Sequence, residues 1–77
     1  MAEKRHCEKV LSLALDIGKG MVKCGAEVNR VEETVIRVCY AYGIEKAQVF
    51  SVISVIHATV IDKESGAHSQ LRRMYSY

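Results

Sequence analysis

Charged side chains crowd into the segment from Glu27 to Glu33, which joins two stretches that have the apolar spacing of helices. Three of them, Glu27, Arg30 and Glu32, are of types that could hold an amino acid, because arginine binds a carboxylate through paired hydrogen bonds and glutamate attracts an ammonium group. A helix N-terminus would strengthen the attraction for the carboxylate. A solvated helix face is the simpler interpretation of these charges, and contact with a small amino acid or carboxylate is the alternative.

Other motifs that could carry chemistry are incomplete. The adjacent carboxylates Glu32 and Glu33 lie about 100° apart around a helix, so they cannot easily act on one substrate. His6-Cys7 could supply half of a metal site, but no second pair of ligands follows at a metal-binding spacing. Gly18-Lys19-Gly20 resembles part of a phosphate loop but lacks the following serine or threonine, so close packing of helices is the better interpretation. We therefore expect no enzyme activity, no metal and no cofactor.

The composition is that of one small domain. The chain has 77 residues, of which 49% are hydrophobic, and a formal net charge of +2. A domain of this size buries only ~60% of the surface that its unfolded chain exposes. The low net charge and the lack of a lysine or arginine cluster argue against nucleic acid as a partner. The cysteines, Cys7, Cys24 and Cys39, form no C-x-x-C pair and are expected to be buried free thiols in a reducing compartment.

The first helix is expected to run from about Glu3 to Cys24. Its apolar residues cover well over half of its circumference and leave a narrow polar strip that includes Ser12 and Asp16. A helix that packs on one neighbour needs a narrower apolar face. This helix is therefore expected to contact two surfaces, either two elements of its own domain or one element and a partner. Gly25 comes directly after this helix, and glycine readily adopts the left-handed conformation that ends a helix.

The second helix is expected from about Asn29 to Tyr42, with Gly43 ending it. Apolar residues at i, i+3 and i+4 spacing, mostly valines, give this segment a clear core-facing stripe. Asn29 and Glu32 have the spacing of a capping box, which would satisfy free N–H groups at the start of the helix. Glu32 therefore has two candidate roles, one as a capping residue and one as a carboxylate that faces a ligand.

From Glu45 onward the sequence changes to β-branched residues without a helical charge pattern. The segment from Gln48 to Ile61 is too short and too polar for a membrane span, and is expected to form one long bent strand or two strands. Asp62 to Gly66 is expected to be a hairpin loop, and His68 to Tyr77 a further strand. The predicted fold is therefore α+β, with two antiparallel helices packed on one face of a small antiparallel sheet of two or three strands.

Five short motifs follow one another along the chain: Gly25 to Glu27, Arg30 to Thr34, Tyr42-Gly43, Val49-Phe50 and Leu71 to Arg73. In this order they resemble the N-terminal soluble part of the threonine/serine exporter family. The resemblance covers the chain roughly from Val10 to Met74. The chain departs from the family pattern at Ile53, where a proline would be expected, and at His57, where a large apolar residue is usual.

The resemblance implies a cytosolic helix-helix-sheet domain that precedes several transmembrane helices, in a family associated with the export of small amino acids or dicarboxylates. Residues 1–77 would then be a single domain, either a fragment or a truncated N-terminal cytosolic domain of a larger membrane protein. Its expected role is that of an accessory or gating domain of a secondary exporter, which does not transport alone. The alternative is a small-molecule-binding or regulatory oligomerisation module.

The resemblance also implies where the domain acts and through which residues. The expected partners are transmembrane segments of the same or a neighbouring polypeptide, at the cytoplasmic side of the cell membrane. The residues that match the family pattern and could contact a ligand or another domain are Glu27, Arg30, Glu32, Thr34, Arg72 and Arg73. We assign no catalytic role to any of these residues.

Self-association is a further expectation from the sequence. Exposed sheet edges pair readily with identical edges, and surplus apolar helix surface tends to become buried. We therefore expect homo-oligomers that form through the edge from Leu71 to Tyr77, through the face of Leu11, Leu15 and Val22, or through both.

Overall fold

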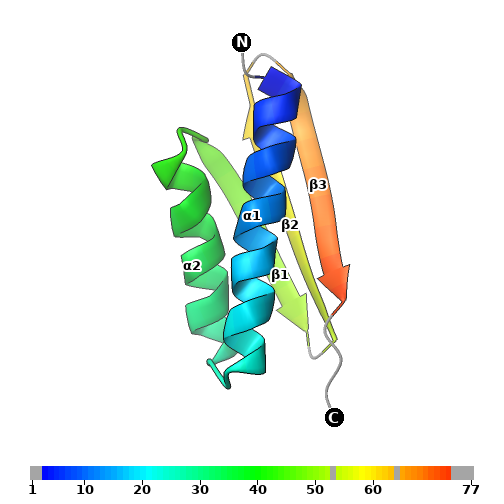
Figure 1. Ribbon diagram of the computed structural model, residues 1–77. Coiled ribbons are helices and arrows are strands. Elements are labelled where there is room, and N and C mark those ends of the chain that lie inside the picture. The colour runs from blue at the N-terminus through cyan, green and yellow to red at the C-terminus, as the bar shows by residue number, and fades with distance from the viewer. Residues whose placement is uncertain (1–2, 53, 64, 74–77) are drawn as a thin grey trace.

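Two helices come first along the chain and three strands follow (Figure 1). The computed structural model describes residues 3–52, 54–63 and 65–73. The elements, in chain order, are α1 (Glu3–Lys23), α2 (Val28–Ala41), β1 (Lys46–Val52), β2 (Val55–Asp62) and β3 (Gly66–Arg73). The predicted α+β class is confirmed. Ile53, where the family pattern would have a proline, and the predicted strand residues 74–77 lie outside the described ranges.

Both helices end in a glycine with a left-handed backbone, as the sequence predicts. After α1, Gly25 has a φ of 89° and its N–H donates to the Val22 carbonyl at 2.9 Å, while the Ala26 N–H donates to the Met21 carbonyl at 3.0 Å. This pair of bonds is the Schellman motif, in which glycine avoids the steric cost that other residues incur. Gly43, with a φ of 90°, ends α2 in the same way.

The start of α2 differs from the prediction, because the capping box of Asn29 and Glu32 does not form. The helix begins at Val28, its N-cap residue is Glu27, and the N-cap side chain makes no capping hydrogen bond. Glu32 instead turns toward the sheet, where its Oε2 accepts hydrogen bonds from the N–H and the hydroxyl of Ser51. The exposed start of α2 can bond to water, whereas the half-buried Ser51 gains more from a protein acceptor.

The strands form one antiparallel sheet in the order β1-β2-β3. A tight turn joins β1 and β2, since Val52 pairs with Val55, so the long β-branched segment is two strands and not one bent strand. The predicted hairpin loop joins β2 and β3, since Asp62 pairs with Gly66. Within this loop the Asp62 carboxylate accepts bonds from the N–H and the hydroxyl of Ser65, which stabilises the turn.

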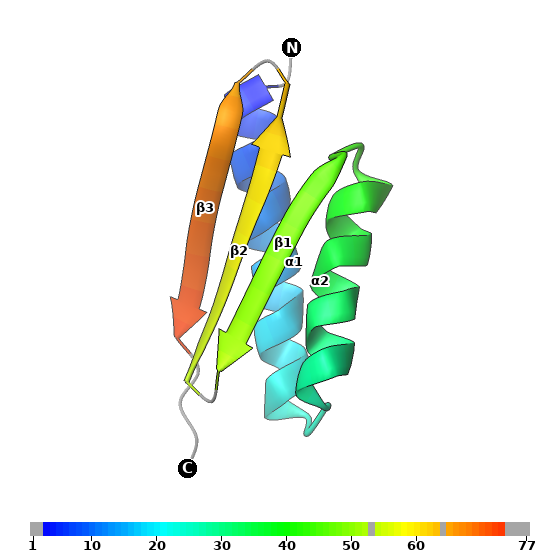
Figure 2. The ribbon, with the colours of Figure 1, turned by 180° about the vertical axis from the view of Figure 1, so that it is seen from behind.

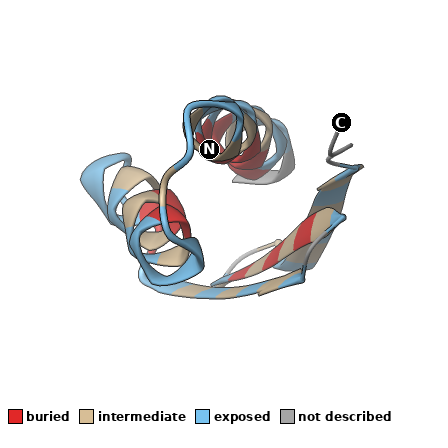
Figure 3. Ribbon diagram, turned by 90° about the horizontal axis from the view of Figure 1, so that it is seen from below, coloured by how far each residue is buried: buried red, intermediate tan, exposed pale blue. Residues whose placement is uncertain are grey.

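The helices cover one face of the sheet and leave the other face open (Figures 2 and 3). α1 contacts β2 and β3, and α2 contacts β1 and α1. Every second residue of β2 points toward the helices and is buried. The core consists of this inner row, the apolar stripes of the two helices and one residue of the loop between α2 and β1: Cys7, Val10, Leu11, Ala14, Leu15, Val31, Val35, Cys39, Ile44, Ile56, Ala58 and Val60.

The wide apolar face of α1 has two neighbours within its own domain, which are the sheet and α2. Leu11 and Leu15 are completely buried, and Val22 is half-buried. The expectation of an association surface is therefore wrong for Leu11 and Leu15, because the domain itself covers both. The first of the two alternatives for this helix, contact with two elements of its own domain, is confirmed.

Gly18 marks a close approach of α1 to its neighbours. A Cβ atom at this position would lie 3.0 Å from a methyl of Val35, 3.2 Å from one of Ile56 and 3.3 Å from one of Val31. Gly20, in contrast, has nothing within 4 Å of the corresponding position. The close packing predicted for the Gly18-Lys19-Gly20 segment is therefore confirmed at Gly18.

Two of the cysteines are buried, as predicted, and the third is not. Burial raises the pKa of Cys7 and of Cys39 above the ordinary value of 9.0. Both buried thiols therefore stay protonated, and so unreactive, near neutral pH. Cys24 is exposed because it lies in the turn after α1, so its predicted burial is wrong. All three thiols are free.

Candidate functional site

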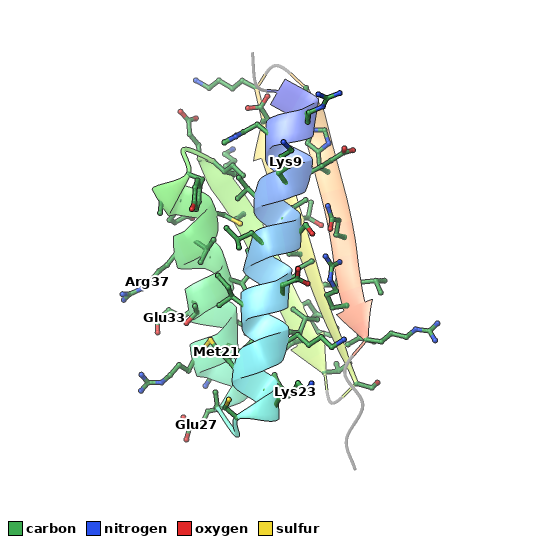
Figure 4. All side chains as sticks on the ribbon, viewed as in Figure 1. Lys9, Met21, Lys23, Glu27, Glu33 and Arg37 are labelled. Carbon is green, nitrogen blue, oxygen red and sulfur yellow. The ribbon has the colours of Figure 1, made fainter. Side chains whose placement is uncertain are left out.

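The candidate residues from the sequence do not form a single site. Four of them belong to α2 or the residue before it, and two belong to the end of β3: Glu27, Arg30, Glu32, Thr34, Arg72 and Arg73. Figure 4 shows Glu27 at the end of the molecule where α2 begins, pointing away from the sheet. The two groups belong to opposite layers of the fold, so each has its own set of partners.

The outer side of α2 is a solvated, charged face. Arg37 donates from Nη2 to Glu33 Oε2 at 3.2 Å, and both side chains are mostly exposed. Figure 4 shows this pair pointing away from the rest of the molecule. An exposed ion pair one helical turn apart stabilises a helix by only a few tenths of a kcal/mol. The structure therefore supports a solvated helix face for Glu33, with Arg37 as its exposed partner.

Arg30 and Glu32 point to different sides of α2, because residues two positions apart on a helix do not face each other. Glu32 faces β1 and is half-buried. Arg30 is exposed, and its side chain makes no hydrogen bond or ion pair within the described part of the chain. The Thr34 hydroxyl donates to the Arg30 carbonyl at 2.9 Å, which is a bond within the helix. The helix thus does not direct Arg30 and Glu32 toward one ligand.

The Glu32 carboxylate connects the two layers at the edge of the sheet. Its Oε2 lies 2.9 Å from the Ser51 backbone nitrogen and 3.1 Å from the Ser51 hydroxyl oxygen. The N–H and O–H both donate to an ionised acceptor, and such charge-assisted bonds are stronger than neutral ones. This contact ties the first half of α2 to β1 and thereby fixes the orientation of the charged helix face.

Removing this carboxylate is expected to weaken the domain. Glu32→Ala leaves the half-buried Ser51 N–H without its acceptor, so the free energy of unfolding should fall by about 1–3 kcal/mol. Glu33→Ala is the matched control, because it removes the neighbouring exposed carboxylate and should cost less than about 0.5 kcal/mol. Urea unfolding of both variants measures the difference. Equal midpoints for the two variants would show that the Glu32 contact does not hold the layers together.

Arg72 of β3 is used to hold α1 on the sheet. Its Nε donates to Asp16 Oδ1 at 2.9 Å and its Nη2 donates to Ser12 Oγ at 2.9 Å. Nη1 makes two further bonds within its own strand, to Gln70 Oε1 at 3.4 Å and to the Leu71 carbonyl at 3.1 Å. Four partners leave Arg72 little capacity for a ligand. Arg73, the next residue along β3, points to the opposite side of the sheet and is exposed.

The partners of the candidate residues were not predicted from the sequence. Ser12 and Asp16 were assigned only to the polar strip of the first helix. Their i, i+4 spacing places them on one face, so a shared partner could have been considered. Nothing local to Ser51 indicates that its N–H lies opposite Glu32. The pairing depends on how β1 lies against α2.

A shallow hollow follows the outer edge of β1. It extends from Ile36 of α2 past Val49 and Phe50 to His57 and Thr59 on the open side of the sheet. None of the six candidate residues lines this hollow. Within the part of the chain that the structure describes, no group of three or more histidine, cysteine, aspartate or glutamate side chains could hold a metal ion.

Two antiparallel helices on one face of a three-stranded antiparallel sheet define a two-layer α+β domain, whose candidate residues serve mainly as contacts between layers or as exposed charges. The family described as "Putative threonine/serine exporter" matches residues 12–77. The chain therefore belongs to the threonine/serine exporter family, as the sequence motifs predict. No curated protein and no solved structure gives a significant match. In the ranges that the structure describes, no helix has both the length and the hydropathy needed to cross a membrane.

Proposed function

We propose that this domain is an accessory or gating domain, on the cytosolic side, of a secondary exporter of threonine and serine or of dicarboxylates. The observation that carries the proposal is the family match over residues 12–77, which includes most of α1 and all of the remaining elements. The domain acts together with transmembrane segments of the same or a neighbouring polypeptide and does not transport alone.

The arrangement of exposed charges supports contact with another domain. β3 ends at the same end of the molecule at which α2 begins (Figure 1). Glu27 and Arg30 from the helical layer and Arg73 from the sheet are therefore presented at or near one end, and all three are exposed. Glu32 and Arg72 hold the layers in register behind them. Exposed charges at one end of a well-packed domain are suited to contact with a neighbouring domain.

Export by intact cells tests this function. Cells from which the coding segment for this chain has been removed should release preloaded threonine more slowly than cells in which the chain has been restored. Serine and succinate, loaded in parallel, identify which class of substrate depends on the domain. Release that is independent of the chain for all three compounds would refute the proposed function.

A further inference from the structure

The face of the sheet that points away from the helices has a polar part and an apolar part. Gln48, Thr59 and Ser69 pair in one row across the three strands, and the Thr59 and Ser69 hydroxyls share a hydrogen bond of 2.8 Å. The next two rows, toward the β1–β2 turn, are mostly apolar. These rows form what we call the open-face patch: Phe50, His57 and Leu71 in one row, and Val52, Val55 and Arg73 in the other.

The open-face patch exposes large apolar side chains that the domain does not cover. Phe50 is 64% exposed, Leu71 51% and Val52 45%. An antiparallel sheet with one solvated face commonly carries polar residues on that face. A contiguous exposed apolar patch with a charged rim marks an interaction surface. The polar row separates this patch from Ile61, which is 44% exposed nearer the other end of the same face.

The formal charges on the described part of the open face are all positive. Lys46 lies at one end of the face and Arg73 at the other, and no aspartate or glutamate occupies a position between them. A face-to-face pair of two copies would bring these like charges together without counter-charges, which is unfavourable. The complementary occupant is therefore apolar at the centre and negatively charged around it.

The shape of the sheet further limits which partner can bind the open-face patch. Figure 3 shows the sheet curving around the helices, so the open face is its convex side. A partner helix needs a groove along the centre of the face, whereas the hollow lined by Phe50 and His57 is shallow and follows the edge of β1. Two convex faces touch over little area. The interface of a lipid bilayer is deformable and accommodates a convex apolar surface to a depth of roughly 5–10 Å.

We propose that the open-face patch docks on the anionic surface of a phospholipid bilayer. Phe50, Val52 and Leu71 enter the boundary between headgroups and acyl chains, and Arg73 lies beside the lipid phosphates. The helices and the charged outer face of α2 then point away from the membrane. This docking goes beyond the exporter function, because it requires no transported substrate and is measured without one.

Vesicle binding by the 77-residue chain tests the proposal. Sedimentation with vesicles of phosphatidylcholine mixed with phosphatidylglycerol is compared with sedimentation with phosphatidylcholine alone. The chain should bind the anionic vesicles more tightly, and added salt should weaken this binding. Phe50→Ser should lower the partition coefficient at least about tenfold, since a buried phenylalanine is lost. Arg73→Glu should lower it roughly tenfold, because one phosphate contact is replaced by repulsion.

Two matched variants on the opposite side of the molecule control for net charge and hydrophobicity. Arg37→Glu changes the net charge by the same amount as Arg73→Glu, and Tyr40→Ser removes an exposed aromatic ring from α2. Both should bind vesicles as the wild type does, with unchanged far-UV circular dichroism. The proposal would be overturned if each control variant lost as much vesicle binding as its open-face counterpart, or if the chain did not bind anionic vesicles. A dimer in the absence of lipid that Phe50→Ser dissociates would also overturn it, by assigning the patch to a second copy.

Discussion

Leu15→Asp is expected to unfold the domain at room temperature. Leu15 is completely buried where α1 contacts the sheet and α2, so the variant loses a core side chain and buries a carboxylate. Core truncation alone costs about 2–5 kcal/mol, and an unpaired buried charge adds more. The total reaches the ~5 kcal/mol at the lower end of domain stability, where such a small core places this chain. Far-UV circular dichroism and thermal melting measure the loss.

Leu13→Asp is the control for this prediction, because it places the same charge two residues away on the same helix. Leu13 is 42% exposed, so its replacement should leave the domain folded. A folded Leu15→Asp variant that had only changed its oligomeric state would contradict the structure. It would support the earlier expectation that this side of α1 is an association surface.

Gly18→Leu is also expected to lower the stability of the domain. The position already lies 3.0–3.3 Å from methyl groups of Val35, Ile56 and Val31, so added atoms must push α1 away from α2 and β2. Overpacking costs about 1–3 kcal/mol, and contact with three methyl groups puts this site at the upper end, above the gain of ~1 kcal/mol from replacing a glycine within a helix. Chemical denaturation of Gly18→Leu and Gly20→Leu measures the cost of overpacking and the gain from replacing a helical glycine.

Gly20→Leu should gain helix stability without the cost of overpacking. Nothing lies within 4 Å of the Cβ position of Gly20, so the variant should be more stable than the wild type by up to ~1 kcal/mol. If both leucine variants were stabilised, α1 would not approach α2 and β2 as closely as the structure has it.

Features set by neighbouring residues could be predicted from the sequence. Gly25 and Gly43 mark the helix ends because a left-handed cap depends only on the local chain. The hairpin at Asp62 to Gly66 follows from turn residues between two β-branched or alternating segments. The Asn29 and Glu32 capping box failed for a physical reason. A local preference of about 1 kcal/mol lost to a tertiary partner, the half-buried N–H of Ser51.

The candidate site was less predictable, since it depends on contacts between distant parts of the chain. Arg72 was selected because it matches the family pattern, but its partners Asp16 and Ser12 lie on α1, at the other end of the sequence. The open-face patch depends on register. Phe50 and Leu71 come together only because both lie opposite His57 in the central strand. Alternation within each strand indicates a face, but not which residues share a row.

Threonine efflux from intact cells tests the exporter assignment most directly. Cells that lack the chain are loaded with a threonine-containing dipeptide, and threonine release is followed after the chain is restored as wild type, as Leu13→Asp or as Leu15→Asp. We predict that the wild type and the folded Leu13→Asp variant restore release and that Leu15→Asp does not. Equal release from cells with and without the chain, for threonine, serine and succinate alike, would contradict the account.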